Sequence, residues 1–299
     1  MPEFRLPSGT HVGFVHLRVS DADEARAFYG ELLGFRPVQS RQNLGQETLA
    51  LSATGEEPVH LLLTEKPGAR PKPPQTCGLF HVAIRLPDRQ ALAGTFKRLL
   101  AHNWPFQGFS DHGVSEALYL ADPDGLGLEL YRDRPREEWP RRNGQIEMHT
   151  NPLDLQDLLA EVADESAPWD GIHPGTDIGH IHLQVSQLAE AENFYHDILG
   201  LDVTQRSYPG ALFFSAGGYH HHVGTNIWAS RGAPPAPEDA VGLISFSLEI
   251  PDREAWAAMV ARIRENRADI TIKENKSSAS ASFSDRFGNG VELTSRYSV

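Results

Sequence analysis

The chain has 299 residues, 40 % of them hydrophobic and 22 % charged, which is enough for two ordinary globular domains. Its net charge of −13 argues against nonspecific binding to nucleic acids or anionic membranes, which needs clustered lysine and arginine. No apolar run approaches the ~18 residues that span a bilayer, and the N-terminus lacks a signal-peptide pattern. The single cysteine, Cys77, excludes an intramolecular disulfide framework and fits a reducing compartment. We therefore expect a cytoplasmic protein that binds small molecules and has no nucleic acid or membrane partner. A homo-oligomer is compatible with these features.

The sequence contains two kinds of unit, and each occurs twice. The first kind starts with the strand GFVHLRVS at Gly13 and returns as GHIHLQVS at Gly179, each time followed by an amphipathic helix. The second kind starts with GLFHVAIRL at Gly78 and returns as GLISFSLEI at Gly242, each time followed by Pro-Asp-Arg and a helix. The pattern therefore indicates four modules of similar structure.

We predict an α+β fold in which four βαβββ modules form two similar halves, with curled mixed sheets and helices on the outer face. The N-terminal pair of modules covers residues 8–133, and the C-terminal pair covers residues 176–299. A linker at 134–175 joins them, and its segment LDLQDLLAEV (153–162) is typical of a short helix.

Strand alternation places several polar side chains on one face of the predicted sheets. His16, His81 and Glu129 lie opposite the aliphatic residues of their strands, and His180 and His182 share one face of theirs. Because the aliphatic set packs under the helices, these polar groups face the hollow side. Two imidazoles and a carboxylate are the ligands of a divalent metal with open positions, and a buried carboxylate without a cation is costly.

Two segments resemble a known group of proteins, the vicinal oxygen chelate superfamily. HGVSEALYLADPDGLGLELY (112–131) resembles the signature region of its extradiol ring-cleaving dioxygenases. HIHLQVS with GGYHHHVGTNIW (217–228) resembles bacterial catechol-2,3-dioxygenase-type proteins. The resemblance implies a metal-dependent enzyme that opens a catechol-type aromatic ring with O2, next to the diol.

The resemblance also implies the metal and its ligands. The metal would be Fe(II), with Mn(II) as the alternative, and two of its ligands would be His81 and Glu129. The third ligand depends on which modules pair: it is His16 if the first and second modules pair, and His182 if the second and third do. We favour His182.

Further residues are candidates for catalysis by the same resemblance. His112 is the candidate acid or base, since imidazole accepts and returns protons near neutral pH, and Tyr119 would hydrogen-bond the substrate. In the tract 220–222, strand alternation predicts that His220 and His222 line the hollow and that His221 faces away. The fourth module has Ser245 where the second has His81, so we expect one metal centre in the chain.

Three other functions stay open. Glyoxalase-type isomerases of the superfamily usually add a second carboxylate, for which the sequence offers no convincing candidate. Binding proteins of the drug-resistance type usually lack the metal ligands. A related enzyme that keeps the metal but acts on another substrate is the third alternative.

Overall fold

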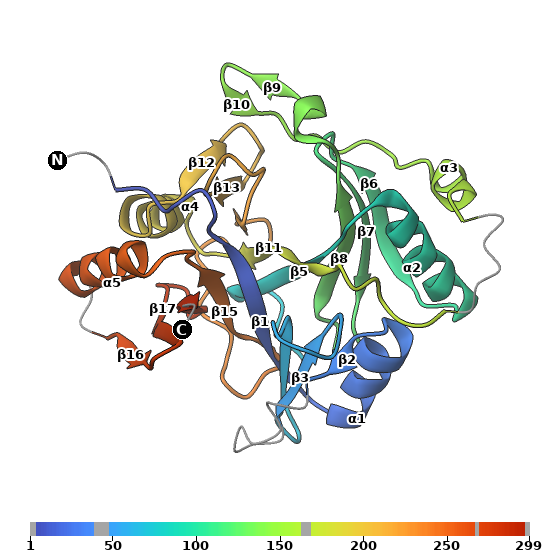
Figure 1. The fold of residues 1–299 in the computed structure, drawn as a ribbon, viewed down its shortest axis with the longest axis horizontal. Coiled ribbons are helices and arrows are strands. Elements are labelled where there is room, and N and C mark those ends of the chain that lie inside the picture. The colour runs from blue at the N-terminus through green and yellow to red at the C-terminus, as the bar shows by residue number, and fades with distance from the viewer. Residues whose placement is uncertain (1–3, 39–47, 163–168, 267–268, 297–299) are drawn as a thin grey trace.

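The computed structural model describes residues 4–38, 48–162, 169–266 and 269–296. These form two mixed eight-stranded sheets and a small two-stranded one, with helices on the outer faces. Figure 1 shows α2 and α5 on opposite outer sides of the molecule, with the strands between them. The predicted α+β fold is confirmed.

The first large sheet joins the second and third modules, in the order β12-β13-β14-β11-β5-β8-β7-β6. The second module contains β5 (Gly78–Leu86), α2 (Arg89–Ala101), β6 (Phe106–Asp111), β7 (Ser115–Ala121) and β8 (Gly127–Asp133). The third contains β11 (Asp177–Gln184), α4 (Leu188–Glu192) continuing as the π-helix η4 (Asn193–Ile198), β12 (Asp202–Gln205), β13 (Ala211–Ser215) and β14 (Val223–Asn226). We call this sheet the site sheet.

The other large sheet joins the first and fourth modules, in the order β16-β17-β18-β15-β1-β4-β3-β2, and we call it the partner sheet. The first module contains β1 (His11–Val19), α1 (Ala22–Ala25) continuing as the π-helix η1 (Arg26–Leu32), β2 (Arg36–Pro37), β3 (Thr48–Ser52) and β4 (Leu61–Glu65). The fourth contains β15 (Gly242–Glu249), α5 (Arg253–Asn266), β16 (Thr271–Glu274), β17 (Ser278–Ser284) and β18 (Gly290–Arg296).

Strand pairing therefore answers the question that the sequence left open. β5 runs antiparallel to β11, with His81 opposite His182, and β1 runs antiparallel to β15, with His16 opposite Ser245. Each half of the chain thus contributes one module to each sheet. The division into an N-terminal and a C-terminal domain around 134–175 stays a prediction.

A repeated tyrosine contact links consecutive modules across the two sheets. Tyr29, in η1 of the first module, donates to Asp122 in the turn of the second at 2.9 Å. Tyr195, in η4 of the third module, donates to Asp285 in the turn of the fourth at 2.8 Å. Both tyrosines and both aspartates are buried, so each contact anchors a helix on its neighbour's turn. The Asp-Pro-Asp-Gly segment at 122–125 is thus a structural turn.

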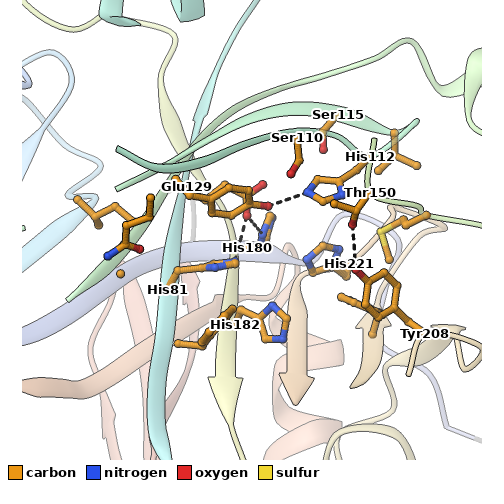
Figure 2. A pocket seen from close by; sticks show the side chains of 18 of the residues that line it. His81, Ser110, His112, Ser115, Glu129, Thr150, His180, His182, Tyr208 and His221 are labelled. Atoms are coloured by element: carbon orange, nitrogen blue, oxygen red, sulfur yellow. Dashed lines mark hydrogen bonds and ion pairs between the residues drawn. The ribbon is translucent and has the colours of Figure 1, made fainter. Parts of the chain in front are cut away.

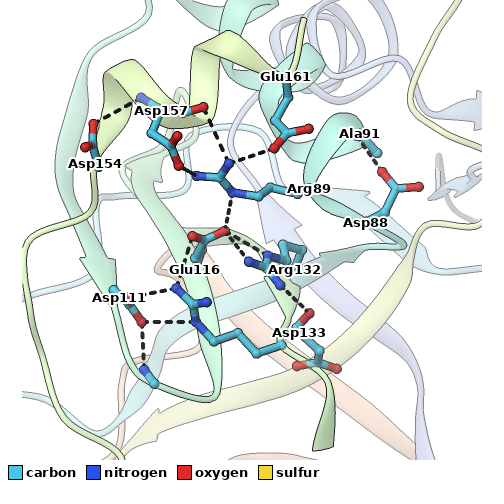
Figure 3. Close-up of polar contacts among 12 residues, drawn as sticks. Asp88, Arg89, Ala91, Asp111, Glu116, Arg132, Asp133, Asp154, Asp157 and Glu161 are labelled. Atoms are coloured by element: carbon cyan, nitrogen blue, oxygen red, sulfur yellow. Dashed lines mark hydrogen bonds and ion pairs between the residues drawn. The ribbon is translucent and has the colours of Figure 1, made fainter. Parts of the chain in front are cut away.

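The bridge between the halves packs against the second module. It contains the 3-10 helix η3 (Arg136–Glu138), the hairpin β9 (Arg141–Arg142) and β10 (Gln145–Ile146), and α3 (Leu155–Ala160) inside the predicted helical segment. Figure 3 shows the ionic network that fixes it: Arg89 of α2 contacts buried Glu116 of β7 as well as Asp157 and Glu161 of the bridge. The network thereby ties α3 to the hairpin of β6 and β7, which borders the site described below.

Candidate metal centre

Three titratable side chains meet at the centre of the site sheet. His81 on β5, Glu129 on β8 and His180 on β11 come from three adjacent strands, and their donor atoms lie within 4.8 Å of one another. Oε2 of Glu129 lies 3.0 Å from Nε2 of His81 and 3.1 Å from Nε2 of His180. Figure 2 shows the three side chains converging at the cavity. At most 6 % of any of the three residues is exposed.

The chemistry of this cluster fits a divalent metal. Burial would raise the pKa of Glu129, but the two neighbouring imidazoles hold it well below its usual range, so the group is a carboxylate. Burial lowers the pKa of His180 to about 4, which leaves a neutral imidazole. Nε2 of His81 is buried and makes no aligned hydrogen bond, although the carboxylate oxygen is near. An ion bound between the three groups would satisfy this buried nitrogen of His81.

His182, the expected third ligand, lies beside this cluster. Its Nε2 is buried without a hydrogen-bond partner, but it is not among the donor atoms that lie within 4.8 Å of one another. Its ring packs against Phe80 and Trp228, at centroid distances of 5.1 and 5.5 Å. His16, the other alternative, lies in the partner sheet and hydrogen-bonds Thr64 at 2.7 Å. The geometry therefore favours His180, which alternation places on the same face as His182.

His112 and Tyr119 form a hydrogen-bonded pair beside Glu129. Nε2 of His112 lies 2.7 Å from the Tyr119 hydroxyl, and Tyr119 stands directly opposite Glu129 in the β7–β8 ladder. Nδ1 of His112 lies 2.6 Å from the carbonyl oxygen of His149. Because a carbonyl only accepts, Nδ1 carries a proton, and when this is the single proton of the ring the tyrosine hydroxyl donates to Nε2. Burial, reinforced by the charge of Glu129, raises the pKa of Tyr119 well above its usual value.

The histidine tract takes the opposite orientation from the predicted one. His221 lines the cavity, whereas His220 bonds to Asp133 at 2.9 Å and His222 faces Ser215 at 3.3 Å. The tract precedes β14, which begins at Val223, so strand alternation does not govern residues 220–222.

The cluster opens into a cavity of about 310 Å³, at the lower end of the volumes typical of small-molecule sites. Its apolar walls include Phe80 and Trp228, which are 37 % and 47 % exposed and contact each other at 5.3 Å between ring centroids. The bridge contributes Met148 and Thr150, a role that no sequence pattern predicted. Glu129 is the single carboxylate among the described residues that line the cavity.

Residues 10–130 and 177–293 match the model of the Glyoxalase/Bleomycin resistance protein/Dioxygenase superfamily. The chain belongs to this superfamily, which confirms the resemblance found in its sequence.

Among its relatives, the catechol-2,3-dioxygenase of Bacillus subtilis (strain 168) is 43 % identical over 273 residues, which cover 89 % of this chain and 92 % of the relative. A solved structure of a candidate dioxygenase from Bacillus subtilis has a TM-score of 0.66 at 15 % identity, over 99 % of this chain and 87 % of the other. Glyoxalase I from Zea mays has a TM-score of 0.55 at 14 % identity, over 96 % of this chain and 92 % of the other. At these identities the two structures show a shared fold.

Among the residues that the structure describes, no helix is long and apolar enough to cross a membrane.

Proposed function

We propose that this protein is a metal-dependent extradiol dioxygenase, which opens a catechol-type aromatic ring with O2. The observation that carries the proposal is the convergence of His81, Glu129 and His180 in a cavity that also contains the His112–Tyr119 pair and His221. The relative that is 43 % identical over most of both chains supports the same activity.

His81, Glu129 and His180 would hold the ion. A bound Fe(II), with Mn(II) as the alternative, would supply open coordination positions for both catechol oxygens and for O2, and the electron transfer between them. Glu129 contributes one negative charge beside the neutral imidazole of His180, which favours a divalent ion in this buried site.

The remaining polar groups of the cavity would handle the protons. Tyr119 shares a hydrogen bond with His112, and its hydroxyl oxygen can accept a further one from a substrate hydroxyl. His221 lines the same cavity and can take the proton that a catechol must lose to bind as a catecholate. The apolar walls lower the dielectric around these groups, which strengthens their electrostatic interactions.

The structure weighs against the glyoxalase alternative. Enzymes of that type usually add a second carboxylate, but Glu129 is the one carboxylate among the described lining residues. The drug-binding alternative does not account for a buried carboxylate held next to two imidazoles, which is costly without a cation. We also propose a cytoplasmic, reducing location, because Cys77 is free and buried.

The test uses protein that is purified anaerobically, analysed for bound metal and then given catechol and oxygen. We expect about one Fe or Mn per chain, oxygen uptake and a yellow ring-opened product. Metal-free protein that is fully stable and binds small molecules would support the binding alternative. Isomerisation of a hemithioacetal without oxygen uptake would support the glyoxalase alternative, and either result would overturn the proposal.

A further inference from the structure

A buried hydrogen-bonded chain leads away from the cavity behind His221. Nδ1 of His221 lies 2.8 Å from Nδ1 of His220, and Nε2 of His220 lies 2.9 Å from Oδ1 of Asp133. Asp133 is the last residue of β8, the strand that also carries Glu129. The chain thus runs from the cavity wall to the end of the strand that supplies a candidate metal ligand.

The far end of this chain is an ionised carboxylate. Burial would raise the pKa of Asp133, but the hydrogen bond from His220 and the charge of Arg85 hold it below its usual value. Arg85 contacts Oδ2 of Asp133 at 3.2 Å, and the Tyr219 hydroxyl donates to the same carboxylate at 2.9 Å. A carboxylate in this state only accepts hydrogen bonds.

That acceptor sets the direction of the hydrogen bonds in the chain when each histidine carries a single proton. Because Asp133 accepts, Nε2 of His220 carries a proton, and when this is the single proton of the ring the other nitrogen, Nδ1, is an acceptor. Nδ1 of His221 must therefore donate to it, which leaves Nε2 of His221 with a free lone pair. Among the described residues this nitrogen has no hydrogen-bond partner.

We propose that Asp133 and His220 are positioning residues, which hold His221 in the tautomer whose unprotonated Nε2 faces the cavity. The His221 ring packs at 4.0 Å between centroids against His180, so it lies beside a candidate metal ligand. Figure 2 shows His221 among the side chains that line the cavity, next to His180. The catalytic consequence rests on the proposed function: an unprotonated Nε2 of His221 can accept a hydrogen bond from a catechol hydroxyl in the cavity.

A second possible use of these rings is less consistent with the geometry. His180, His220 and His221 also have donor atoms within 4.8 Å of one another, as a further metal site would require. Both nitrogen atoms of His220 are already used in the chain, however, and the one toward His221 makes a normal hydrogen bond. Hydrogen bonding therefore explains this group without an ion.

The tautomer can be measured directly in the wild-type protein, without metal or substrate. Protein labelled with 15N in histidine is studied by NMR at pH 8, above the ordinary pKa of imidazole, and His221 is assigned by its replacement. We expect the signals of an unprotonated Nε2 and a protonated Nδ1 for His221. A protonated Nε2 in the wild-type protein would overturn the proposal, and this result does not depend on whether the protein cleaves catechols.

Asp133→Asn is the variant that reverses the direction of the hydrogen bonds from His221 through His220 to residue 133. Arg85 can only donate, so the amide oxygen turns to Arg85 and the amide NH2 donates to His220, which must then donate to His221. We expect His221 to switch to the protonated Nε2 tautomer and kcat to fall by ~10²–10⁴, with little change in KM. Asp177→Asn is the matched control, because Asp177 pairs with Arg85 at 2.6 Å but does not touch His220.

Asp177→Asn should keep both the tautomer and the activity. An Asp133→Asn protein that folds, keeps the wild-type tautomer and loses no activity would refute the positioning role. If wild-type protein consumes no oxygen with catechol, the proposed function fails, while the tautomer measurement still decides the present inference.

Discussion

The two large sheets are built from the same kinds of module, yet only the site sheet assembles a candidate metal centre among the described residues. Strand register makes their positions comparable: His81 faces His182 in the site sheet, and Ser245 faces His16 in the partner sheet. By the same register Glu129 corresponds to Glu292, which lies opposite Ser247 as Glu129 lies opposite Ala83.

The partner sheet has the carboxylate but has no imidazole at the positions that correspond to His81 and His180. Position 245 is a serine whose hydroxyl donates to Glu292 at 2.9 Å, and position 14, which corresponds to His180, is phenylalanine. A hydroxyl satisfies the glutamate without an ion, so the duplicated sheet needs no metal to be stable. The comparison indicates that the same fold accommodates a glutamate beside two histidines or a glutamate that accepts from a serine. The side chains at these positions, and not the fold, therefore define the function.

The largest expected effect distinguishes the two glutamates. Glu129→Gln should lose the bound metal and lower the rate of oxygen uptake with catechol by ~10²-fold or more, because it removes an anionic ligand. Glu292→Gln should keep both, since Glu292 accepts a hydrogen bond from Ser245. Metal analysis and oxygen uptake check both variants, and equal losses in the two would contradict the assignment of the centre to one sheet.

The next prediction concerns the two histidines of β11. His180→Ala should lower metal affinity by about two orders of magnitude or more, whereas His182→Ala should keep the metal and raise KM, because His182 lines the cavity. Metal titration of both purified variants gives the answer. Loss of metal in His182→Ala alone would return the third ligand to the residue that the sequence favoured.

The sequence was sufficient for the fold but not for every part of the site. The internal repeats and strand alternation predicted the α+β modules and a hollow face with His81 and Glu129, because both depend on local periodicity. Alternation could not choose between His180 and His182, since they share a face and the choice depends on register shifts in the β5–β11 ladder. The tract 220–222 misled because it lies before β14 rather than within it.

The ionic network is a smaller difference between the sheets. Arg89 and Arg253 follow the same Pro-Asp pair, but Arg89 contacts Glu116, whose side chain is 5 % exposed, and Arg253 contacts Glu274 at the surface. Glu116→Gln should destabilise the fold by about 3–5 kcal/mol, because the positive charges of Arg89 and Arg132 lose their buried partner. Glu274→Gln should cost less than about 1 kcal/mol. Chemical denaturation measures both, and equal costs would show that burial of the network is unimportant.

The smallest effect is a dependence of stability on pH that comes from the partner sheet. Burial, with a contribution from Arg18, lowers the pKa of His16 from 6.5 to about 4. The unfolded chain therefore binds this proton more readily, so the contribution of His16 to stability is complete above pH 6.5 and is lost as the pH falls toward 4. Each pH unit in that window costs at most about 1.4 kcal/mol. His16→Gln removes the titration and should flatten the acid side of the stability profile, measured by denaturation in metal-free protein between pH 4 and 8. An unchanged acid slope would mean that His16 takes up its proton equally well in the folded and the unfolded chain.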